Sequence, residues 1–352
     1  MTRSEILAWL RLDDESELET LWLLAEQTRR EHVGDAVHLR GLVEISNHCV
    51  RECHYCGLRA PNEGVSRYRM TADEILACAR EAESYGYGTV VLQSGEDYGL
   101  TTQWVAQLVS RIKAETKLAI TLSLGERGGD ELAVWRDAGA DRYLLRFETS
   151  SDRLYQRIHP PLRGVRSDRL AILRRLRELG YEVGSGVMIG IPGQTFADLA
   201  DDLVLFRELD LDMIGVGPFI PYPGTPLGHV EPHVGDQVPS TELMTYKVIA
   251  LSRRICPRAN IPSTTALATL NEASGRELGL LRGANVMMPN VTPPRYRHRY
   301  EVYPGKACLW EATGHWHASV RGRIESMGRT VGVGRGDSPS RRMRSLKSVP
   351  RS

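Results

Sequence analysis

Cys49, Cys53 and Cys56 are the residues whose types and spacing most directly indicate chemistry. They form a C-x3-C-x2-C loop that follows the apolar run 41–45, which we interpret as part of a β-strand. Three thiolates from one loop can hold a cubane iron–sulfur cluster, and because that cluster has four irons, one iron keeps no protein ligand. The spacing therefore predicts a metal centre whose open iron can bind a substrate or cofactor.

Zinc and a disulfide are the alternatives for these thiols. A zinc site would take its fourth ligand from His48 or His54, but zinc sites usually draw their ligands from two separated pairs, and the sequence has no second pair. A disulfide is disfavoured because six cysteines in 352 residues, with no hydrophobic signal core at the N-terminus, are typical of a reducing compartment. We therefore expect a cytoplasmic protein with an iron–sulfur cluster.

The elements that must position this loop alternate between short apolar runs and amphipathic segments of helical length. Strands separated by helices pair in parallel through right-handed crossovers, and residues of functional type follow each strand, as at the mouth of a closed barrel. The sequence therefore predicts an α/β fold with a complete (β/α)8 TIM-type barrel rather than a doubly wound open sheet. The eight expected strands end with or include the runs 41–45, 89–93, 118–122, 143–147, 183–189, 213–216, 261–265 and 284–288.

Helical periodicity accounts for the other segments. Residues 3–30 carry Leu and Trp at helical spacing, which predicts two N-terminal helices, and Thr71-Ala-Asp-Glu74 has the form of a capping box. We divide the chain into an N-terminal helical segment, 1–35, a barrel domain, 36–320, and a short C-terminal extension, 321–352. Further helices are expected to begin at Thr101, Gly129, Ser167, Thr195, Ser240 and Ala273.

Charge is unevenly distributed along the chain. The formal net charge is +1, but residues 321–352 hold nine Lys/Arg and two Asp/Glu. Residues 1–320 therefore hold 36 Lys/Arg and 42 Asp/Glu. Because Gly, Ser and Pro separate these basic residues and no aromatic residues interleave, we expect a solvated, poorly ordered tail rather than one that binds nucleic acid. No apolar run approaches the roughly 18 residues of a membrane helix, so we expect no membrane association.

Polar residues follow the expected strands. After 89–93 comes Gln93-Ser-Gly-Glu96-Asp97, whose carboxylates suit a cationic amine, although the same residues also form an ordinary Asx-type turn. Ser123 follows the third strand and is a further candidate for cofactor binding. Arg146 and Glu148 end the fourth strand as a charged pair, which we expect to face polar contents of the barrel, with a structural ion pair as the alternative.

The last strands carry hydroxyls and a thioether. Thr264 and Thr265 end the seventh strand and Met288 ends the eighth, which is a plausible lining for a small polar or metal-bearing ligand, although Met in a barrel is more often core. Tyr300 and Tyr303 follow one helical turn apart, and we expect them to lean over the mouth of the barrel.

The cysteine loop, with Tyr55 just before its third cysteine, resembles the signature loop of the radical S-adenosylmethionine (SAM) enzymes. The resemblance implies one [4Fe-4S] cluster whose open iron chelates SAM, and one electron that cleaves SAM to methionine and a 5′-deoxyadenosyl radical. It implies that the turn with Gln93 and Glu96 orients the methionine ammonium. Glu148 would bind the ribose hydroxyls or the ammonium, and Arg169 the carboxylate, which a guanidinium matches with two hydrogen bonds.

Longer matches resemble the HydE family of [FeFe]-hydrogenase maturases, from about residue 40 to about residue 310. The resemblance implies that the radical acts on a small iron complex bearing CO, cyanide and cysteine, with other hydrogenase maturases and a low-potential flavodoxin or ferredoxin as partners. It places Glu148 and Arg169 at SAM, and Arg146, Thr264, Thr265, Met288, Tyr300 and Tyr303 around the substrate. The matching segments are 55–59, 68–71, 91–97, 121–126, 138–146, 217–221 and 284–290.

The sequence departs from this family at two places. Some members hold an auxiliary iron–sulfur cluster on three C-terminal cysteines, but this chain has Cys308 with Trp316 and Ser319 at the other two positions, so we expect no auxiliary cluster. Phe147 stands where the resemblance implies a histidine near the substrate. Cys78 and Cys256 lie in expected helices and are interpreted as packed thiols.

Two other functions remain open. Another radical SAM enzyme, such as a methylornithine-synthase-like mutase or a biotin-synthase-like sulfur inserter, would share the barrel and the cysteine loop. Sulfur insertion is disfavoured because it needs a second cluster within the barrel, and no expected strand carries a cysteine. A non-catalytic iron–sulfur carrier would share the loop, but it has no need of the turn at 93–97 or of polar residues at every strand end.

Overall fold

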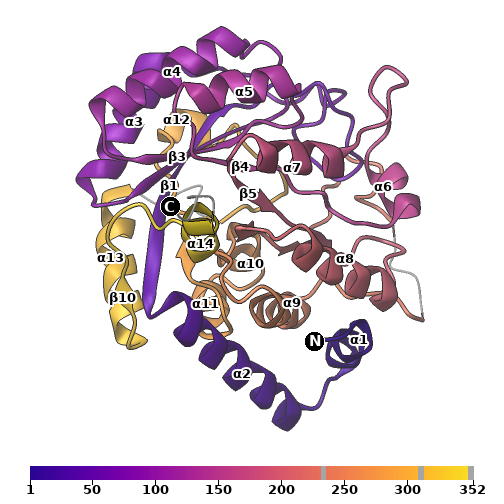
Figure 1. The fold of residues 1–352 in the computed structure, drawn as a ribbon. Helices are drawn as coiled ribbons and strands as arrows, with labels where there is room; N and C mark the ends of the chain where they lie inside the picture. Colours follow the sequence, from indigo (N-terminus) through magenta and orange to yellow (C-terminus); the bar gives the residue numbers. More distant parts are fainter. Residues whose placement is uncertain (231–234, 308–312, 348–352) are drawn as a thin grey trace.

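A computed structural model describes residues 1–230, 235–307 and 313–347. Two helices, α1 (Arg3–Arg11) and α2 (Glu15–Val33), precede the first strand, as the sequence predicts. Thr2 and Glu5 form a capping box that starts α1, and the Asp14 carboxylate accepts the N–H groups that start α2. Both helices pack against α9 (Glu242–Ile255), on the outside of the sheet (Figure 1).

A curled parallel sheet forms the centre of the molecule. Its strands pair in the order β1 (Ala36–Ser46), β2 (Thr89–Ser94), β3 (Ala119–Ser123), β4 (Arg142–Leu144), β5 (Glu182–Ser185) and β7 (Met213–Ile214), all parallel. The helices surround it (Figure 1): α3 (Ala72–Ser84), α4 (Thr102–Glu115), α5 (Gly129–Asp137), α6 (Asp152–Ile158), α7 (Arg169–Glu178), α8 (Phe196–Glu208), α9, α10 (Thr265–Leu270), α11 (Gly275–Leu281) and α12 (Pro294–Arg297). The predicted α/β fold of the TIM-barrel type is confirmed.

The side of the barrel between β7 and β1 differs from the sequence prediction. Single parallel bridges join Met213 to Asn260 and Pro262 to Val286, and β9 (Val286–Met287) pairs in parallel with β1. Parallel contacts thus continue round this side, but no regular strand covers the expected 261–265. The reason is local, because Thr264 caps helix α10 and Thr265 begins it.

The strand predicted over 183–189 is also divided. It forms β5 and then β6 (Met188–Ile189), which pairs with β8 (Gly217–Pro218) in a separate two-stranded sheet. Val187, at the break, forms an isolated bridge with Glu148, whose φ of 66° interrupts a regular ladder at that point.

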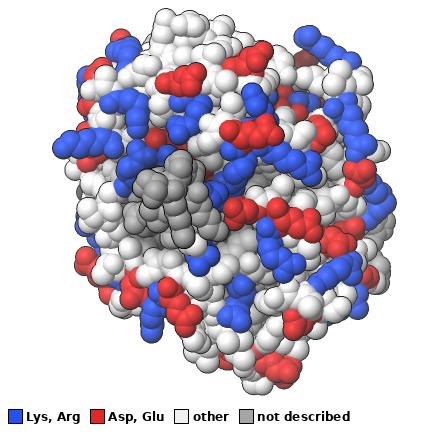
Figure 2. Space-filling model, viewed as in Figure 1, with Lys and Arg blue, Asp and Glu red and all other residues white. Residues whose placement is uncertain are grey.

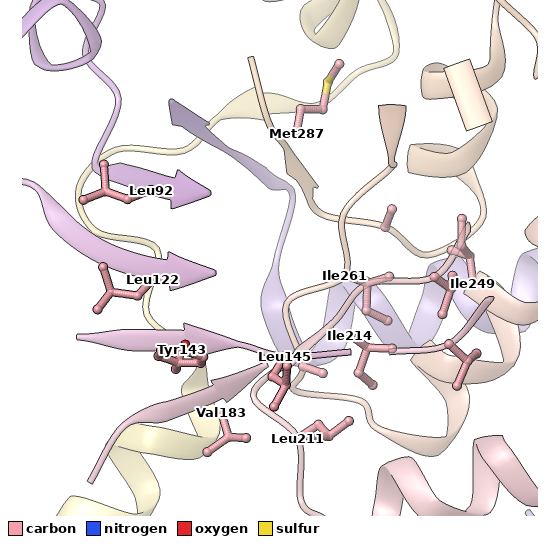
Figure 3. Close-up of a cluster of buried hydrophobic side chains, with 14 of the residues drawn as sticks. Leu92, Leu122, Tyr143, Leu145, Val183, Leu211, Ile214, Ile249, Ile261 and Met287 are labelled. Atoms are coloured by element: carbon pink, nitrogen blue, oxygen red, sulfur yellow. The ribbon is translucent and has the colours of Figure 1, made fainter. Parts of the chain in front are cut away.

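Successive side chains along the strands point alternately to the outside and to the inside of the curled sheet, which produces two layers of side chains. In β2, Val90 and Leu92 pack in the main hydrophobic core, whereas Val91 and Gln93 line a central cavity. Figure 3 shows Leu92, Leu122, Tyr143 and Val183 on neighbouring strands, packed as one cluster. The outward side chains therefore pack against the surrounding helices, and the inward side chains, which line the cavity, can be polar.

The C-terminal extension is ordered where the structure describes it, so the prediction of a poorly ordered tail is wrong for residues up to 347. Helix α13 (Thr313–Ser326) is followed by β10 (Thr330–Val331), which pairs in parallel with β1, and by α14 (Pro339–Lys347). We call residues 329–344 the C-terminal strap. It crosses the N-terminal ends of the strands (Figure 1), where Gly88 gives it room: a Cβ there would lie 1.6 Å from the Gly334 oxygen.

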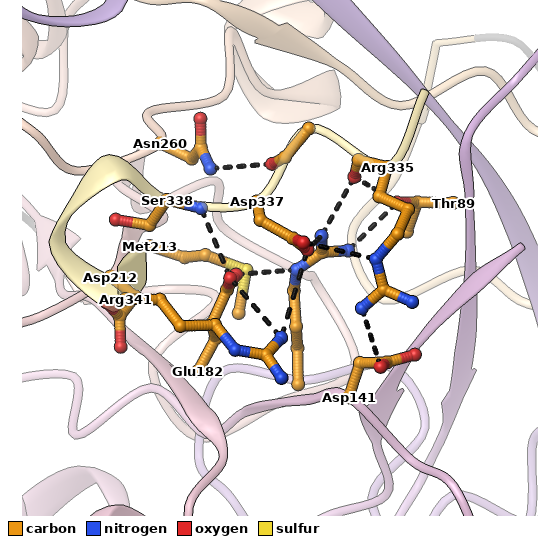
Figure 4. A network of polar contacts seen from close by, with 12 residues as sticks. Thr89, Asp141, Glu182, Asp212, Met213, Asn260, Arg335, Asp337, Ser338 and Arg341 are labelled. Atoms are coloured by element: carbon orange, nitrogen blue, oxygen red, sulfur yellow. Dashed lines mark hydrogen bonds and ion pairs between the residues drawn. The ribbon is translucent and has the colours of Figure 1, made fainter. Parts of the chain in front are cut away.

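Buried charges hold the strap to the barrel (Figure 4). Arg142 is fully buried and pairs with Glu182 at 2.6 Å and with Asp337 of the strap. Arg335 pairs with Asp141 at 2.6 Å, and the Ser338 N–H donates to Glu182 at 3.2 Å. Residues beyond the boundary of 320 that the sequence analysis set for the barrel therefore pack against the barrel, and the strap supplies one of the two counter-charges of Arg142.

The outer surface mixes both signs of charge, and Lys/Arg lie beside Asp/Glu over the face in Figure 2. Many of these residues form exposed ion pairs, such as Arg11 with Asp236. Within the described residues, no helix combines the length and apolar character that crossing a bilayer requires.

Candidate active site

One cavity of about 380 Å³ opens between the C-terminal ends of the strands and reaches inward along them. It brings together residues from nearly every strand end, as the sequence predicts for a barrel mouth. The predicted site residues on its wall are Cys49, Cys53, Tyr55, Cys56, Gln93, Glu96, Ser123, Arg146, Glu148, Arg169, Thr264, Thr265, Met288, Tyr300 and Tyr303. The individual roles of these residues stay predictions.

The cysteine loop is held rigidly over this cavity by backbone hydrogen bonds. The N–H of Val50 donates to Glu96, that of His54 to Ile158 and that of Gly57 to Val302, at 2.9 to 3.0 Å. Gly95 lies so close that a Cβ there would be 2.3 Å from the carbonyl oxygen of His48 in the loop. The guanidinium of Arg67 closes the loop from its other side, donating to the carbonyls of Asn47, Leu58, Arg59 and Asn62.

The three thiols fit an iron–sulfur cluster. All three thiols line the cavity. Burial raises the pKa of Cys56 to about 12 and that of Cys53 well above its ordinary value, and neighbouring cysteines of the loop add to both shifts. Neighbouring buried thiols are unfavourable as free thiolates, but a bound cation supplies the missing positive charge and releases their protons. Neither His48 nor His54, the zinc ligands considered above, lines the cavity.

Arg51 connects the cysteine loop to the opposite wall. Its guanidinium contacts the carboxylates of Glu96 and Glu126, both at 2.8 Å, and Arg169 contacts the other oxygen of Glu126 at 2.8 Å. The four groups are almost completely buried and form an alternating row of charges. The sequence analysis missed Arg51 because residues between metal ligands usually have no role of their own. The only feature of the sequence that could have pointed to Arg51 is its position inside the cysteine loop.

Arg146 and Glu148 form an ion pair at 2.8 Å on the cavity wall, so they are a structural pair that also faces the cavity. The Arg146 guanidinium also donates to the Val187 carbonyl at 2.6 Å. Glu148 has a φ of 66°, a left-handed conformation that costs a non-glycine residue about 1–3 kcal/mol and is concentrated at functional sites. The backbone of Glu148 therefore adopts an unfavourable conformation at a residue whose side chain lines the cavity.

The far wall is formed by residues after β9. Tyr300 is buried rather than lying as a lid, and its hydroxyl accepts a hydrogen bond from Gln93 at 3.3 Å. The Lys306 ammonium lies 4.9 Å from the centre of the Tyr300 ring and pairs with the buried Glu44 of β1. Phe147, by contrast, lies outside this cavity and packs edge-on against Phe206, so the missing histidine changes the core rather than the cavity wall.

His159 is a further cavity residue that the sequence analysis missed. It caps the C-terminal end of α6, and its Nδ1 lies 3.2 Å from the sulfur of Cys53. Its Nε2 lies 3.2 Å from the hydroxyl of Tyr55. Burial and the nearby Arg169 and Arg51 hold its pKa well below the ordinary histidine value. No motif marks this position in the sequence.

Residues 43–206 match the Radical SAM superfamily. With the curled parallel sheet and the three-cysteine loop, this match defines a radical SAM enzyme. The [FeFe] hydrogenase maturase subunit HydE of Thermotoga maritima is 45% identical over 331 residues, which cover 94% of this chain and 92% of that protein. The chain belongs to the HydE family.

More distant relatives share the same fold. The 3-methylornithine synthase of Methanosarcina acetivorans is 28% identical over 291 residues, which cover 82% of this chain and 79% of that protein. The crystal structure of methylornithine synthase (PylB) superposes with a TM-score of 0.81 at 27% identity and covers 94% of both chains. The predicted membership of the radical SAM superfamily, and of its hydrogenase-maturase branch, is confirmed.

Proposed function

We propose that this protein acts on a small, cysteine-containing iron complex with CO and cyanide ligands during assembly of the di-iron cluster of [FeFe] hydrogenase. One observation carries the proposal: a single cavity is lined both by the three cysteines of the loop and by the soft thioether of Met288 with the hydroxyls of Thr264 and Thr265. Those groups suit a small polar metal complex better than a large organic substrate. The identity to a HydE maturase supports the same substrate class.

Cys49, Cys53 and Cys56 would hold one [4Fe-4S] cluster, with SAM bound beside it. Once bound and reduced, that pair supplies a 5′-deoxyadenosyl radical, which is the chemistry the superfamily shares. Cys308 lies outside the described residues, and we propose that no auxiliary C-terminal cluster forms, because the sequence leaves one cysteine where that cluster needs three.

The protein's own charges would orient SAM. Arg169 offers a guanidinium fork to a carboxylate, and its Nη1 is held by the Arg146 carbonyl at 2.6 Å. Glu148, Glu96 and Ser123 place oxygen atoms on the same wall, suited to an ammonium or to ribose hydroxyls. Because Arg51 already pairs with Glu96 and Glu126, these carboxylates are fixed in place before any ligand arrives.

The substrate side of the cavity would exclude water. Lys306 donates to the Tyr300 carbonyl at 3.2 Å and pairs with Glu44, so the segment 300–306 is fastened against β1. Tyr300 and Tyr303 then close the wall beside Met288. A closed pocket protects a radical and strengthens polar contacts made inside it.

The proposal includes partners and a compartment. A low-potential flavodoxin or ferredoxin would supply the electron, other hydrogenase maturases would deliver the iron complex and receive the product, and the reaction would take place in the cytoplasm.

Hydrogenase activity in cells tests the proposal. Cells that lack their own HydE but hold the other maturases should regain hydrogenase activity when this protein is expressed, and the Cys53→Ala variant should not restore it. If soluble, cluster-loaded protein fails to restore activity, a methylornithine-synthase-like mutase becomes the better assignment. That rival is supported by the TM-score of 0.81 to methylornithine synthase and by the 28% identity to 3-methylornithine synthase.

A further inference from the structure

The His159 ring is fixed on three sides beside Cys53. It stacks on Tyr155, with ring centres 4.9 Å apart and planes at 26°, and it meets the Tyr55 ring edge-on at 5.5 Å. Its backbone N–H donates to the Tyr155 carbonyl at 2.8 Å, and the side chain is 6% exposed. The imidazole therefore has one orientation, with Nδ1 toward the Cys53 sulfur and Nε2 toward the Tyr55 hydroxyl.

The direction of the hydrogen bond follows from the chemistry of the sulfur. A cysteine that ligates iron is a thiolate and has no proton to donate, so the proton between the two atoms must be on Nδ1. Tyr55 can then donate its hydroxyl proton to Nε2, which is the acceptor of that tautomer. Both ring nitrogens are thereby satisfied, in a place where an unpaired buried nitrogen would be costly.

We propose that His159 is a positioning residue for the iron–sulfur cluster: its Nδ1–H donates a hydrogen bond to the Cys53 thiolate, orients that ligand and favours the reduced cluster. The inference rests on the proposed role of Cys53 as a cluster ligand. Reduction adds negative charge that spreads onto the sulfurs, and a donor at a sulfur stabilises the more negative state. The contact links α6 to the loop that α6 covers, because the His54 N–H also donates to the Ile158 carbonyl at 3.0 Å.

A pair of substitutions separates the hydrogen bond from simple packing. His159→Leu keeps an apolar side chain of similar size but removes the donor, whereas His159→Asn places an amide N–H close to the position of Nδ1. We expect the equilibrium constant for cluster reduction to fall three- to tenfold in His159→Leu and to stay within twofold in His159→Asn. Tenfold corresponds to 59 mV for a one-electron couple, so an EPR-monitored redox titration resolves it.

Iron and sulfide content is measured on the same samples, so that the result does not depend on activity. His54→Leu is the matched control, because this half-buried imidazole adjoins Cys53 in the chain but does not line the cavity, and its midpoint potential should equal that of the unaltered protein. If His159→Leu loads no cluster while His159→Asn loads four irons, the orienting role is supported directly.

Two results would overturn the inference. One is a His159→Leu cluster with an unchanged midpoint potential. The other is His159→Asn sharing the defect of His159→Leu, whether that defect is a lowered midpoint potential or failure to load four irons. If the unaltered protein itself bound no cluster under the same conditions, the proposed function would fail instead, and the two failures are therefore distinguishable.

Discussion

Arg51 shows how single residues shape this site. Its side chain is 11% exposed and lies between two carboxylates that are 3% and 9% exposed, so it supplies a positive counter-charge to both of them in the cavity wall. It lies two residues from the first predicted ligand, which joins the metal loop to the residues proposed to contact SAM.

Arg51→Met should therefore destabilise the protein. The substitution leaves Glu96 and Glu126 buried without their shared cation, and removal of one partner from a buried ion pair costs about 3–5 kcal/mol. Urea denaturation of the metal-free protein measures this loss. Arg59→Met, in the same loop but with a half-exposed side chain, should change the free energy of unfolding by less than about 1 kcal/mol; equal effects of the two changes would contradict the account.

Arg169→Lys should weaken SAM binding. Lysine keeps the charge but loses the fork that matches a carboxylate, and a charge-assisted hydrogen bond is worth about 1.5–3 kcal/mol, so the Kd should rise about 10- to 100-fold. Calorimetry on cluster-loaded protein measures the Kd. Arg175→Lys, an exposed position on the same helix, serves as the control, and an unchanged Kd for Arg169→Lys would remove this residue from the SAM site.

At the scale of elements, the C-terminal strap closes the N-terminal end of the barrel. Arg40 in β1 lines the cavity at this end and donates to the Gly336 carbonyl at 3.1 Å, so the strap supports the cavity floor from outside. Burial lowers the pKa of Arg40 to about 9, with the like charge of Arg142 adding to the effect. An ordered strap is therefore part of the barrel and of its charge balance.

Asp337→Ala should destabilise the protein by about 3 kcal/mol in urea denaturation. It removes one counter-charge of the fully buried Arg142 and leaves Glu182 as the remaining one. The comparison is Asp236→Ala, which breaks an ion pair whose side chains are 52% and 45% exposed and should cost no more than about 1 kcal/mol. Indistinguishable values would mean that the strap contributes little to folding.

Asp202 in α8 predicts a pH dependence of folding. It is fully buried beneath Ser150, whose N–H donates to it at 2.5 Å, and burial raises its pKa to about 7. Because the folded pKa lies above the unfolded value, the native state holds a proton that the unfolded state has lost, and this contribution to stability falls as pH rises from about 4 to about 7. The fall is up to about 4 kcal/mol, at 1.36 kcal/mol per unit.

Asp202→Asn removes this titration. Its stability relative to the unaltered protein should therefore rise as pH goes from about 4 to about 7, as followed by urea denaturation at several pH values. Asp201→Asn, at an exposed neighbouring position paired with Arg3, should show no such trend. A constant difference for Asp202→Asn across this range would show that Asp202 is ionised throughout.

At the scale of the whole molecule, local patterns predicted the barrel and most of its mouth. Short apolar runs and capping residues such as Thr71 indicate strands and helices from neighbouring residues. Parallel strands bring their C-terminal ends to one place, so Cys49 and Met288 line one cavity although they are far apart in sequence. The sequence analysis missed that Thr264 caps α10. A threonine after an apolar run can either continue a strand or cap a helix, and the apolar run does not distinguish these two outcomes.

Contacts between distant segments could not be predicted in this way. From its sequence alone, the basic tail looks like a solvated segment. Its partners in the fold, among them Asp141, Glu182 and Asp212, lie near the N-terminal ends of three different strands. His159 and Arg51 were missed for the same reason, since their importance comes from what the fold places beside them.

The central claim is that the loop of three cysteines makes this chain a radical SAM enzyme. The most direct test is anaerobic reconstitution with iron and sulfide, followed by dithionite and SAM, with 5′-deoxyadenosine measured as the product. We predict 5′-deoxyadenosine from the unaltered protein and none from Cys53→Ala. Absence of the product from protein that holds four irons, or equal amounts from both proteins, would contradict the account.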